Sequence, residues 1–210
     1  MLSVIIVAAG TSQRMGFDKL MAPLHGKPVL AHSINAFINS SDVAEVILVS
    51  TQERFNKLAI KSDKLKLTSG GKNRHDSVSQ GIAVVSENAT FIAVHDGARP
   101  FISQEQIHRT LEAAQEHGAA ASATRITDTV KRSNTENFAT ESISRENLWA
   151  METPQVFRSD LLKAAYKNIE VSGTLVTDEV SALELIGTQT YLVENHTPNL
   201  KITYPQDLEV

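Results

Sequence analysis

The chain has 210 residues, no cysteine, and a formal net charge of −4 from 20 Lys and Arg against 24 Asp and Glu. The missing cysteines exclude disulfides, thiolate zinc sites and a cysteine nucleophile. The acidic balance excludes a surface that is basic throughout, as nucleic-acid binding would need. No apolar run approaches the ~18 to 20 residues that span a bilayer, and the N-terminus lacks the basic region of a signal peptide. We therefore expect a cytoplasmic protein that binds neither nucleic acid nor membrane.

Strand-like and helix-like patterns alternate along the chain. Apolar runs predict strands at residues 4–8, 46–49, 65–68, 91–94 and 119–124, and again near 191 and 201–203. Periodic spacing and capping residues predict helices from Pro28, across 78–85, from a Ser103/Gln106 capping box to His117, at 159–168 and at 178–186. This order predicts a single α/β domain over 1–210, Rossmann-like, with three α/β/α layers around a mostly parallel sheet.

One segment, from residue 126 to 149, breaks this alternation because it is polar and has few apolar residues suited to a core. It is too long for a routine connection, so we interpret it as functional or as an interaction arm.

The loop after the first strand, residues 8–19, reads AAGTSQRMGFDK. Gly10 and Gly16 allow a tight turn and close approach to a ligand, and free N–H groups after a buried strand form an anion-binding concavity. Arg14 can form two parallel hydrogen bonds to a phosphate, while Lys19 adds a compact positive charge. The loop therefore suits a triphosphate, although it is neither a Walker A nor a G-x-G-x-x-G motif. A turn with two surface cations is the alternative.

Two further loops leave strand ends. Residues 69–77, SGGKNRHDS, contain two glycines and two cations before a helix. This segment suits the binding of a base and phosphates; a loop with a helix N-cap is the alternative. Residues 95–100, HDGARP, put Asp96 where a carboxylate suits Mg²⁺, with Arg99 nearby for a phosphate; a surface Asp–Arg pair is the alternative. Because carboxyl ends of parallel strands share one edge of a sheet, we expect the three loops to form one site.

The motifs, taken in order, carry a family resemblance. AAGxxxRMG followed by Lys19 resembles the signature of sugar-phosphate nucleotidyltransferases. The later motifs are more specific: GGxxRxxS at 70–77, HDxARP at 95–100, DTVK at 128–131, TPQ at 153–155, TDE at 177–179 and NLKIT at 199–203. Together they resemble the 2-C-methyl-D-erythritol 4-phosphate cytidylyltransferase family essentially from end to end.

The resemblance implies an enzyme that condenses CTP with methylerythritol phosphate, giving CDP-methylerythritol and pyrophosphate, with Mg²⁺ or another divalent cation. It implies a homodimer in which an arm at about 126–150 reaches into the partner's site. The implied catalytic residues are Arg14, Lys19 and Lys201. The implied nucleotide-binding residues are Ala8, Ala9, Gly10, Thr11, Ser12, Arg14, Lys19, Gly71, Arg74 and Ser77. The implied acceptor-binding residues are Asp96, which also faces the metal, Arg99, Thr129, Arg145, Thr153, Thr177 and Lys201.

Two departures from the family pattern bear on the triphosphate. Ser12 stands where many relatives have Gly, and Asp18, where they have Pro, adds a negative charge beside Lys19. Apart from the resemblance, Lys201 would be an ordinary exposed lysine and residues 177–178 a helix cap. The functional alternatives are a cytidylyltransferase for another polyol phosphate, such as ribitol 5-phosphate, and a non-catalytic nucleotide-binding regulator. A dinucleotide-dependent oxidoreductase is disfavoured because the G-x-G-x-x-G loop is missing.

Overall fold

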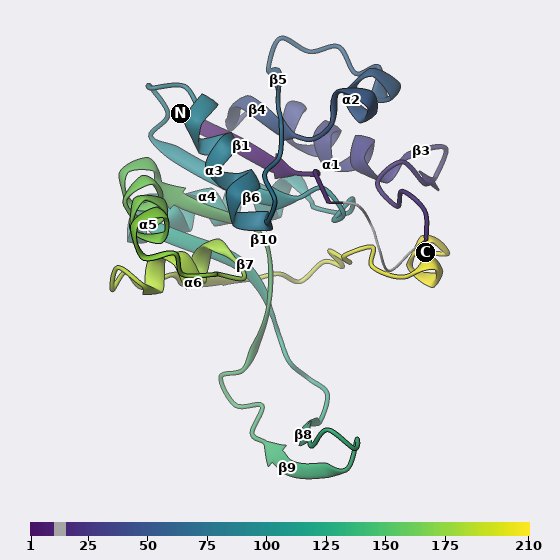
Figure 1. Ribbon diagram of the computed structural model, residues 1–210, viewed down its shortest axis with the longest axis vertical. Coiled ribbons are helices and arrows are strands. Elements are labelled where there is room, and N and C mark those ends of the chain that lie inside the picture. The colour runs from purple at the N-terminus through teal and green to yellow at the C-terminus, as the bar shows by residue number, and fades with distance from the viewer. Residues whose placement is uncertain (11–15) are drawn as a thin grey trace.

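The computed structural model describes residues 1–10 and 16–210, so Thr11, Ser12 and Arg14 lie outside the described residues. Its central feature is a seven-stranded sheet with the order β11-β7-β10-β6-β1-β4-β5 (Figure 1). The strands of this sheet are β1 (Leu2–Val7), β4 (Val43–Val49), β5 (Leu65–Thr68), β6 (Phe91–Asp96), β7 (Ala119–Arg125), β10 (Trp149–Arg158) and β11 (Tyr191–Glu194). The helices are α1 (Val29–Ile38), α2 (Gln52–Leu58), α3 (Arg74–Val84), α4 (Gln104–His117), α5 (Ser159–Ser172), α6 (Glu179–Glu184) and the short 3₁₀ helix η1 (Pro205–Leu208).

The sheet is mostly parallel, as the alternating pattern predicts. β1 pairs in parallel with β4 and with β6, β4 with β5, and β11 with β7, while β10 runs antiparallel between β6 and β7. The chain moves outward from β1 to β4 and β5 and then returns to β6 on the other side of β1. The strand order therefore reverses next to β1, and ligands of open α/β sheets bind beside such a switch point.

Both faces of the sheet are covered by helices, which explains the continuous apolar strands. Ile6 of β1 belongs to one buried cluster with Phe37 of α1 and Ile107 of α4. Ile5, the next residue back, faces the opposite cluster with Val78 of α3 and Leu162 of α5. Because successive side chains of a strand point to opposite faces, β1 is fixed from both sides, and its carboxyl end is a rigid base for the loop that follows.

Two parts of the chain differ from the strands that the sequence predicts. β10 lies where the sequence pattern predicts no strand. A proline normally argues against a central strand, but Pro154 is accommodated where the β10–β7 register shifts between Met151 and Gln155. Residues 201–203 form no strand. Instead, Ile202 is buried and its N–H donates to the Ala98 carbonyl at 2.8 Å, so burial explains the apolar pattern.

The helix from residue 104 to 117 begins and ends as predicted, but the capping box is only half formed. The Ser103 hydroxyl accepts a hydrogen bond from the Gln106 N–H at 3.1 Å, and Gly118 ends the helix with φ +82°. The Gln106 amide donates instead to the Ser122 hydroxyl at 3.0 Å. This helix therefore starts with a Ser N-cap, and Gln106 joins it to the sheet.

The polar segment forms a protruding arm, as expected. Its strands β8 (Val130–Ser133) and β9 (Ala139–Ile143) pair with each other in a separate two-stranded sheet that projects far from the body (Figure 1). A second small hairpin, β2 (Pro23–Leu24) with β3 (Lys27–Pro28), precedes α1. Within the described ranges, no helix combines the length and the apolar character needed to cross a bilayer.

Candidate active site

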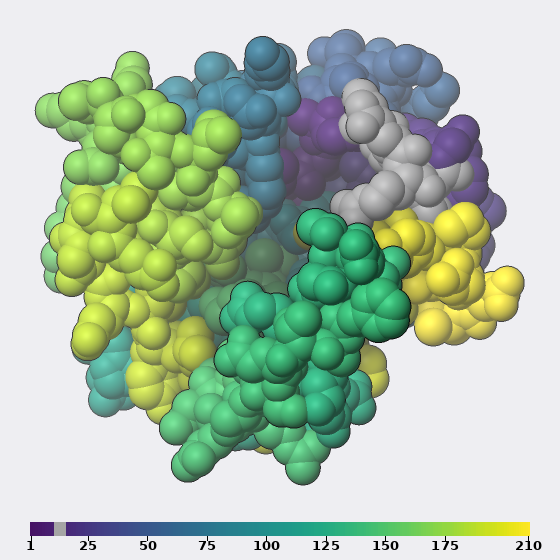
Figure 2. Space-filling view, turned by 60° about the horizontal axis from the view of Figure 1, so that its bottom comes forward, coloured from purple at the N-terminus to yellow at the C-terminus, as the bar shows by residue number. Residues whose placement is uncertain are grey.

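A pocket lies at the carboxyl edge of the sheet, beside the switch point at β1 and β6. Its volume of about 510 Å³ is in the range that holds a small-molecule ligand. Figure 2 shows a hollow on this face, bordered in that view by purple N-terminal residues, blue residues and the light green of α5 and α6. All three predicted loops and the C-terminal segment line the pocket: Val7, Ala8, Ala9, Gly10, Lys19, Leu20, Gly71, Lys72, Asn73, Arg74, Ser77, Asp96, Gly97, Ala98, Lys201 and Thr203.

The first two loops pack directly against each other. A Cβ added at Gly70 would lie 2.2 Å from the Ala9 Cβ, so only glycine permits this approach. The Ser77 hydroxyl accepts a hydrogen bond from the Gly71 N–H at 3.1 Å and donates to the Asn73 carbonyl at 3.1 Å. Ser77, expected near the base and ribose, thus shapes the loop that carries Gly71.

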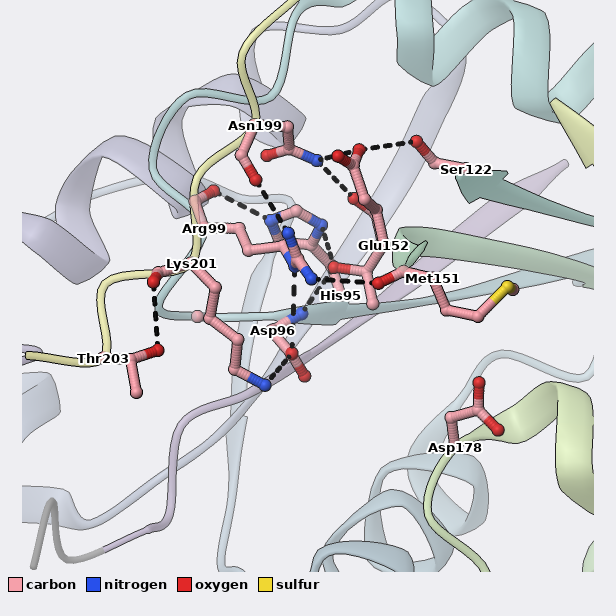
Figure 3. Close-up of polar contacts among 12 residues, drawn as sticks. His95, Asp96, Arg99, Ser122, Met151, Glu152, Asp178, Asn199, Lys201 and Thr203 are labelled. Atoms are coloured by element: carbon pink, nitrogen blue, oxygen red, sulfur yellow. Dashed lines mark hydrogen bonds and ion pairs between the residues drawn. The ribbon is translucent and has the colours of Figure 1, made fainter. Parts of the chain in front are cut away.

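Asp96 is the carboxylate at the centre of the site (Figure 3). Its Oδ2 lies 2.6 Å from Lys201 Nζ and 4.0 Å from Arg99 Nε. Its Oδ1 lies 3.3 Å from Arg74 Nη2. Burial acts to raise the pKa of Asp96, but the positive charges of Arg74 and Lys201 outweigh it and hold that pKa well below its ordinary value. Asp96 is therefore ionised at neutral pH and holds two cations from distant segments in one place.

Arg74 is held from behind by a buried carboxylate. Its Nη1 donates to Glu179 Oε1 at 2.7 Å and its Nη2 to Oε2 at 3.0 Å. The Glu179 side chain is fully buried and also accepts from the Tyr166 hydroxyl at 2.9 Å. Burial opposes the charge of Arg74, yet Glu179 and Asp96 more than compensate and raise its pKa above the ordinary value. The guanidinium is thus a permanent positive charge fixed at the pocket wall.

A second buried chain of hydrogen bonds fixes the Asp96 backbone. His95 Nε2 lies 3.1 Å from the Arg99 carbonyl, which can only accept, so Nε2 carries the proton. The unprotonated Nδ1 then accepts from the Thr153 hydroxyl at 3.0 Å, and Thr153 in turn accepts from the Asp96 N–H at 3.1 Å. Burial lowers the pKa of His95 to about 4, which agrees with a neutral ring. His95 and Thr153 therefore position Asp96.

Arg99 anchors the C-terminal segment that carries Lys201 (Figure 3). Its Nη1 donates to the Asn199 carbonyl at 2.7 Å and its Nη2 to the Met151 carbonyl at 3.2 Å. Glu152 holds the same segment by accepting from the Asn195 amide at 2.8 Å and from the Asn199 amide at 3.3 Å. Arg99 also lines a neighbouring hollow of about 430 Å³ together with Lys201.

Lys19 joins the first loop to the same C-terminal segment. Its Nζ donates to the Ile202 carbonyl at 2.7 Å, although the two residues are 183 positions apart. Lys19 and Lys201 both line the pocket, so two ammonium groups from opposite ends of the chain face one cavity. This is the convergence that the sequence predicts.

Three further predicted residues lie away from this pocket. Thr177 is exposed, and its hydroxyl lies 3.4 Å from the Ser181 hydroxyl. Asp178 caps α6 by accepting from the Ser181 N–H at 3.0 Å, as the capping interpretation expects. Thr129 and Arg145 lie on the arm, exposed to solvent, and Arg145 donates to the Thr127 carbonyl.

The supporting carboxylates were not singled out from the sequence. The TDE motif contains Glu179 but assigns it no role, and Glu152 lies in none of the motifs. A single glutamate in a strand or at a helix start carries no pattern, because its partners lie far away in sequence. The one available signal is the position of Glu179 directly after Asp178 at a helix start, which places Glu179 near the predicted site.

The fold and site together define a class of protein. A cation-rich pocket at the switch point of a mostly parallel sheet, with glycine-containing loops after the strands, is typical of an α/β enzyme that binds phosphorylated ligands.

Comparison with known proteins gives the particular family. The family model of 2-C-methyl-D-erythritol 4-phosphate cytidylyltransferase matches residues 2–210. The enzyme of that name from Alkaliphilus metalliredigens is 39% identical, with 99% of this chain and 90% of the relative covered. The crystal structure of the Francisella tularensis enzyme of that name superimposes with a TM-score of 0.88 at 31% identity, covering 99% of this chain and 96% of that one. A 4-diphosphocytidyl-2C-methyl-D-erythritol synthase from Anaerococcus prevotii gives the same TM-score of 0.88 at 26% identity, covering 100% and 93%. The chain therefore belongs to the 2-C-methyl-D-erythritol 4-phosphate cytidylyltransferase family of nucleotidyltransferase enzymes.

Proposed function

We propose that this protein transfers the cytidylyl group of CTP to 2-C-methyl-D-erythritol 4-phosphate, giving CDP-methylerythritol and pyrophosphate for isoprenoid precursor synthesis. Full-length family membership supports this reaction. The observation that carries it is that Arg74 and Lys201 both contact Asp96 in a pocket that Lys19 also lines. A cytoplasmic location belongs to the proposal, because CTP is supplied there.

The chemical step is an in-line displacement at the α-phosphorus of CTP. An oxygen of the acceptor phosphate forms the new bond to phosphorus, and the bond to the bridging oxygen of pyrophosphate breaks. A phosphate monoester is already an anion near pH 7, since its second pKa is about 6, so no general base is required. The barrier is mainly electrostatic, because two anions must meet while charge builds on the transferring group.

Lys19 and Lys201 would supply the fixed positive charge. Both line the pocket, Lys19 is held by the Ile202 carbonyl and Lys201 by Asp96, and these contacts limit the reorganisation needed as charge develops. Asp96 keeps Lys201 in place before substrate arrives, and a phosphate can then share the ammonium. Arg14, which lies outside the described residues, remains a proposed third cation on the triphosphate.

Different residues would bind the nucleotide and the acceptor. Ala8, Ala9, Gly10 and Gly71 would bring backbone close to the nucleotide, because all four line the pocket. For the acceptor, Arg99 and Lys201 line the neighbouring hollow, which supports their predicted roles. Thr153 acts through His95 and the Asp96 N–H, so we propose a positioning role for it.

A divalent cation belongs to this proposal, with Asp96 as its protein ligand. The Asp96 carboxylate is ionised and lines the pocket, and Mg²⁺ commonly takes one or two carboxylates together with substrate phosphates. In the part of the chain that the structure describes, no three His, Asp or Glu side chains form a metal cluster of their own. Phosphate oxygens would thus supply most of the ligands. When bound, such an ion neutralises charge on the triphosphate.

We also propose a homodimer in which the arm of each subunit completes the partner's site. The arm hairpin projects from the body with Phe138 65% exposed, a large apolar surface for a solvated hairpin. Arg145 and Thr129 lie along this arm, away from their own pocket. An arm that docks on a second copy would bury the exposed ring and bring Arg145 toward an anionic acceptor.

A substrate panel tests the proposed reaction. Pyrophosphate release is measured with CTP and Mg²⁺ in the presence of methylerythritol phosphate, ribitol 5-phosphate or no acceptor. We expect release only with methylerythritol phosphate. Preference for ribitol 5-phosphate would identify the polyol alternative, which the names of the relatives do not favour. No release with any acceptor would identify a non-catalytic regulator.

A further inference from the structure

Arg54 of α2 lies outside all the loops assigned to the substrates, yet it contacts both ends of the first loop. Its Nη1 donates to the Ala8 carbonyl at 2.6 Å and its Nη2 to the Gly10 carbonyl at 2.9 Å. Its Nε donates to Asp18 Oδ2 at 2.7 Å. The Arg54 side chain is only 11% exposed, so most of its surface is shielded from water.

The placement of Arg54 follows from how α2 begins. The helix starts just after β4, and Thr51 caps it by accepting from the Arg54 N–H at 3.3 Å. None of the residues of α2 is fully buried, but Phe55 and Leu58 are partly buried against the core, and these contacts fix the helix to the body. The planar guanidinium directs several donors at fixed angles, which suits three acceptors in different directions; a lysine ammonium lacks this fork.

The contacts on Asp18 extend the effect to Lys19. Asp18 Oδ1 accepts from the Leu20 N–H at 3.2 Å, and the Asp18 carbonyl accepts from the Met21 N–H at 3.1 Å. These bonds shape the turn in which Lys19 sits, and from this turn its Nζ reaches the Ile202 carbonyl. One guanidinium therefore sets the distance between the end of β1 and the turn that carries Lys19.

The same pair resolves the charge problem posed by Asp18. A carboxylate beside Lys19 would repel a triphosphate, but its Oδ2 faces Arg54 at salt-bridge distance. The pair adds no net charge at the pocket rim, and the carboxylate serves as a fixed acceptor.

We propose that Arg54 is a positioning residue for the nucleotide, acting with Asp18 to preset the described ends of the first loop, and Lys19 with them, before the triphosphate binds. This inference rests on the proposed function, because the ligand of the loop is taken to be CTP. A preset loop requires less ordering on binding, so the effect should appear in CTP affinity. Other segments bind the acceptor, so the KM for the acceptor should not depend on Arg54.

Three variants test this role. Arg54→Lys keeps the charge but loses the fork, and Arg54→Gln loses both. Lys57→Gln is the matched control, because it removes the same charge from the same helix, and the ion pair of Lys57 is with exposed Glu53. The KM for CTP and for methylerythritol phosphate is measured by pyrophosphate release, and the Kd for CTP by calorimetry. Circular dichroism and thermal melting identify variants that fold.

We expect both Arg54 variants to raise the KM and the Kd for CTP about tenfold or more, as the loss of charge-assisted hydrogen bonds implies. The KM for the acceptor should stay within about twofold, and Lys57→Gln should leave all constants near wild type. Folded Arg54→Lys with wild-type CTP affinity, or a fall in kcat alone, would overturn the inference. If the wild-type protein releases no pyrophosphate from CTP, the proposed function fails instead, and the two failures are thereby distinguished.

Discussion

Asp96 places a negative charge in a site that must attract phosphate, and its neighbours explain why this is useful. Without Asp96, two buried or half-buried cations would repel each other across the pocket. With it, Arg74 and Lys201 are held at fixed positions at low cost, ready to share their hydrogen bonds with an incoming anion. Preorganised charge of this kind is what lowers an electrostatic barrier.

At the same scale, His95 makes the free energy of unfolding depend on pH. Its folded pKa of about 4 lies below the unfolded value, so the contribution is complete above about pH 6.5 and is lost as pH falls toward 4. We expect a loss of roughly 3 kcal/mol over this window from His95. Urea denaturation between pH 7 and 4.5 measures it.

Two histidine variants separate this effect from other groups. His95→Gln should flatten the pH dependence of the free energy of unfolding in this window. His108 is an exposed control. Asp42 raises the pKa of His108, so the effect of this residue on the free energy of unfolding has the opposite pH dependence. His108→Gln should therefore leave the loss toward acid pH intact. An unchanged slope in His95→Gln would contradict the neutral buried ring.

Glu179 gives a second prediction at the residue scale. Glu179→Gln removes the buried charge that pairs with Arg74, and breaking such a pair costs about 3 to 5 kcal/mol in general. Asp96 still contacts Arg74, so we expect about 3 kcal/mol of destabilisation by urea denaturation. Glu184→Gln, exposed on the same helix, should change the free energy of unfolding by less than about 0.5 kcal/mol. Equal stability of the two variants would show that the buried pair is unimportant.

At the scale of elements, the sequence is informative where apolar patterns are long. The predicted strand at residues 46–49 lies within β4, and the predicted helix ends at His117, because burial imposes their patterns. The sequence pattern does not indicate β10, because Pro154 interrupts it. It does not indicate α2 either, because none of the residues of this helix is fully buried. Arg54 and Glu179 could not be assigned as supports, since their partners lie 36 and 105 positions away.

The arm allows a prediction at this scale through subunit mixing. In the proposed homodimer, Lys19→Ala damages the body of a subunit and Arg145→Ala damages the arm, so a mixed dimer would hold one intact site. Co-refolding equal amounts should restore about one quarter of the wild-type rate, because half of the dimers carry one active site of two.

A matched mixture serves as the control for the arm. Lys19→Ala mixed with Lys201→Ala should recover nothing, since both changes lie in the body and each site keeps one. Activity no greater than the sum of the separate variants in the first mixture would contradict an arm that crosses between subunits.

At the scale of the whole molecule, the strand order decides where the site forms. The chain passes β1, leaves to β4 and β5, and returns to β6, so loops from three parts of the sequence end beside one another. The C-terminal segment then closes the site, with the Ile202 N–H bonded to Ala98 and Lys19 bonded to the Ile202 carbonyl. The meeting of the three loops follows from the strand pattern, whereas Lys201 is expected only from the family resemblance. The buried supports cannot be predicted from the sequence, because they depend on tertiary packing.

The most direct test of this convergence is the rate of the chemical step in Lys19→Ala. Product formation is followed in single turnovers by rapid quench, at saturating CTP and methylerythritol phosphate, with Lys57→Ala as an exposed lysine control. We expect Lys19→Ala to lose roughly 10² to 10³ in rate, equivalent to ~3 to 4 kcal/mol of transition-state stabilisation, while Lys57→Ala keeps the wild-type rate. A Lys19→Ala protein that turns over as fast as wild type would contradict a pocket in which converging cations drive the transfer.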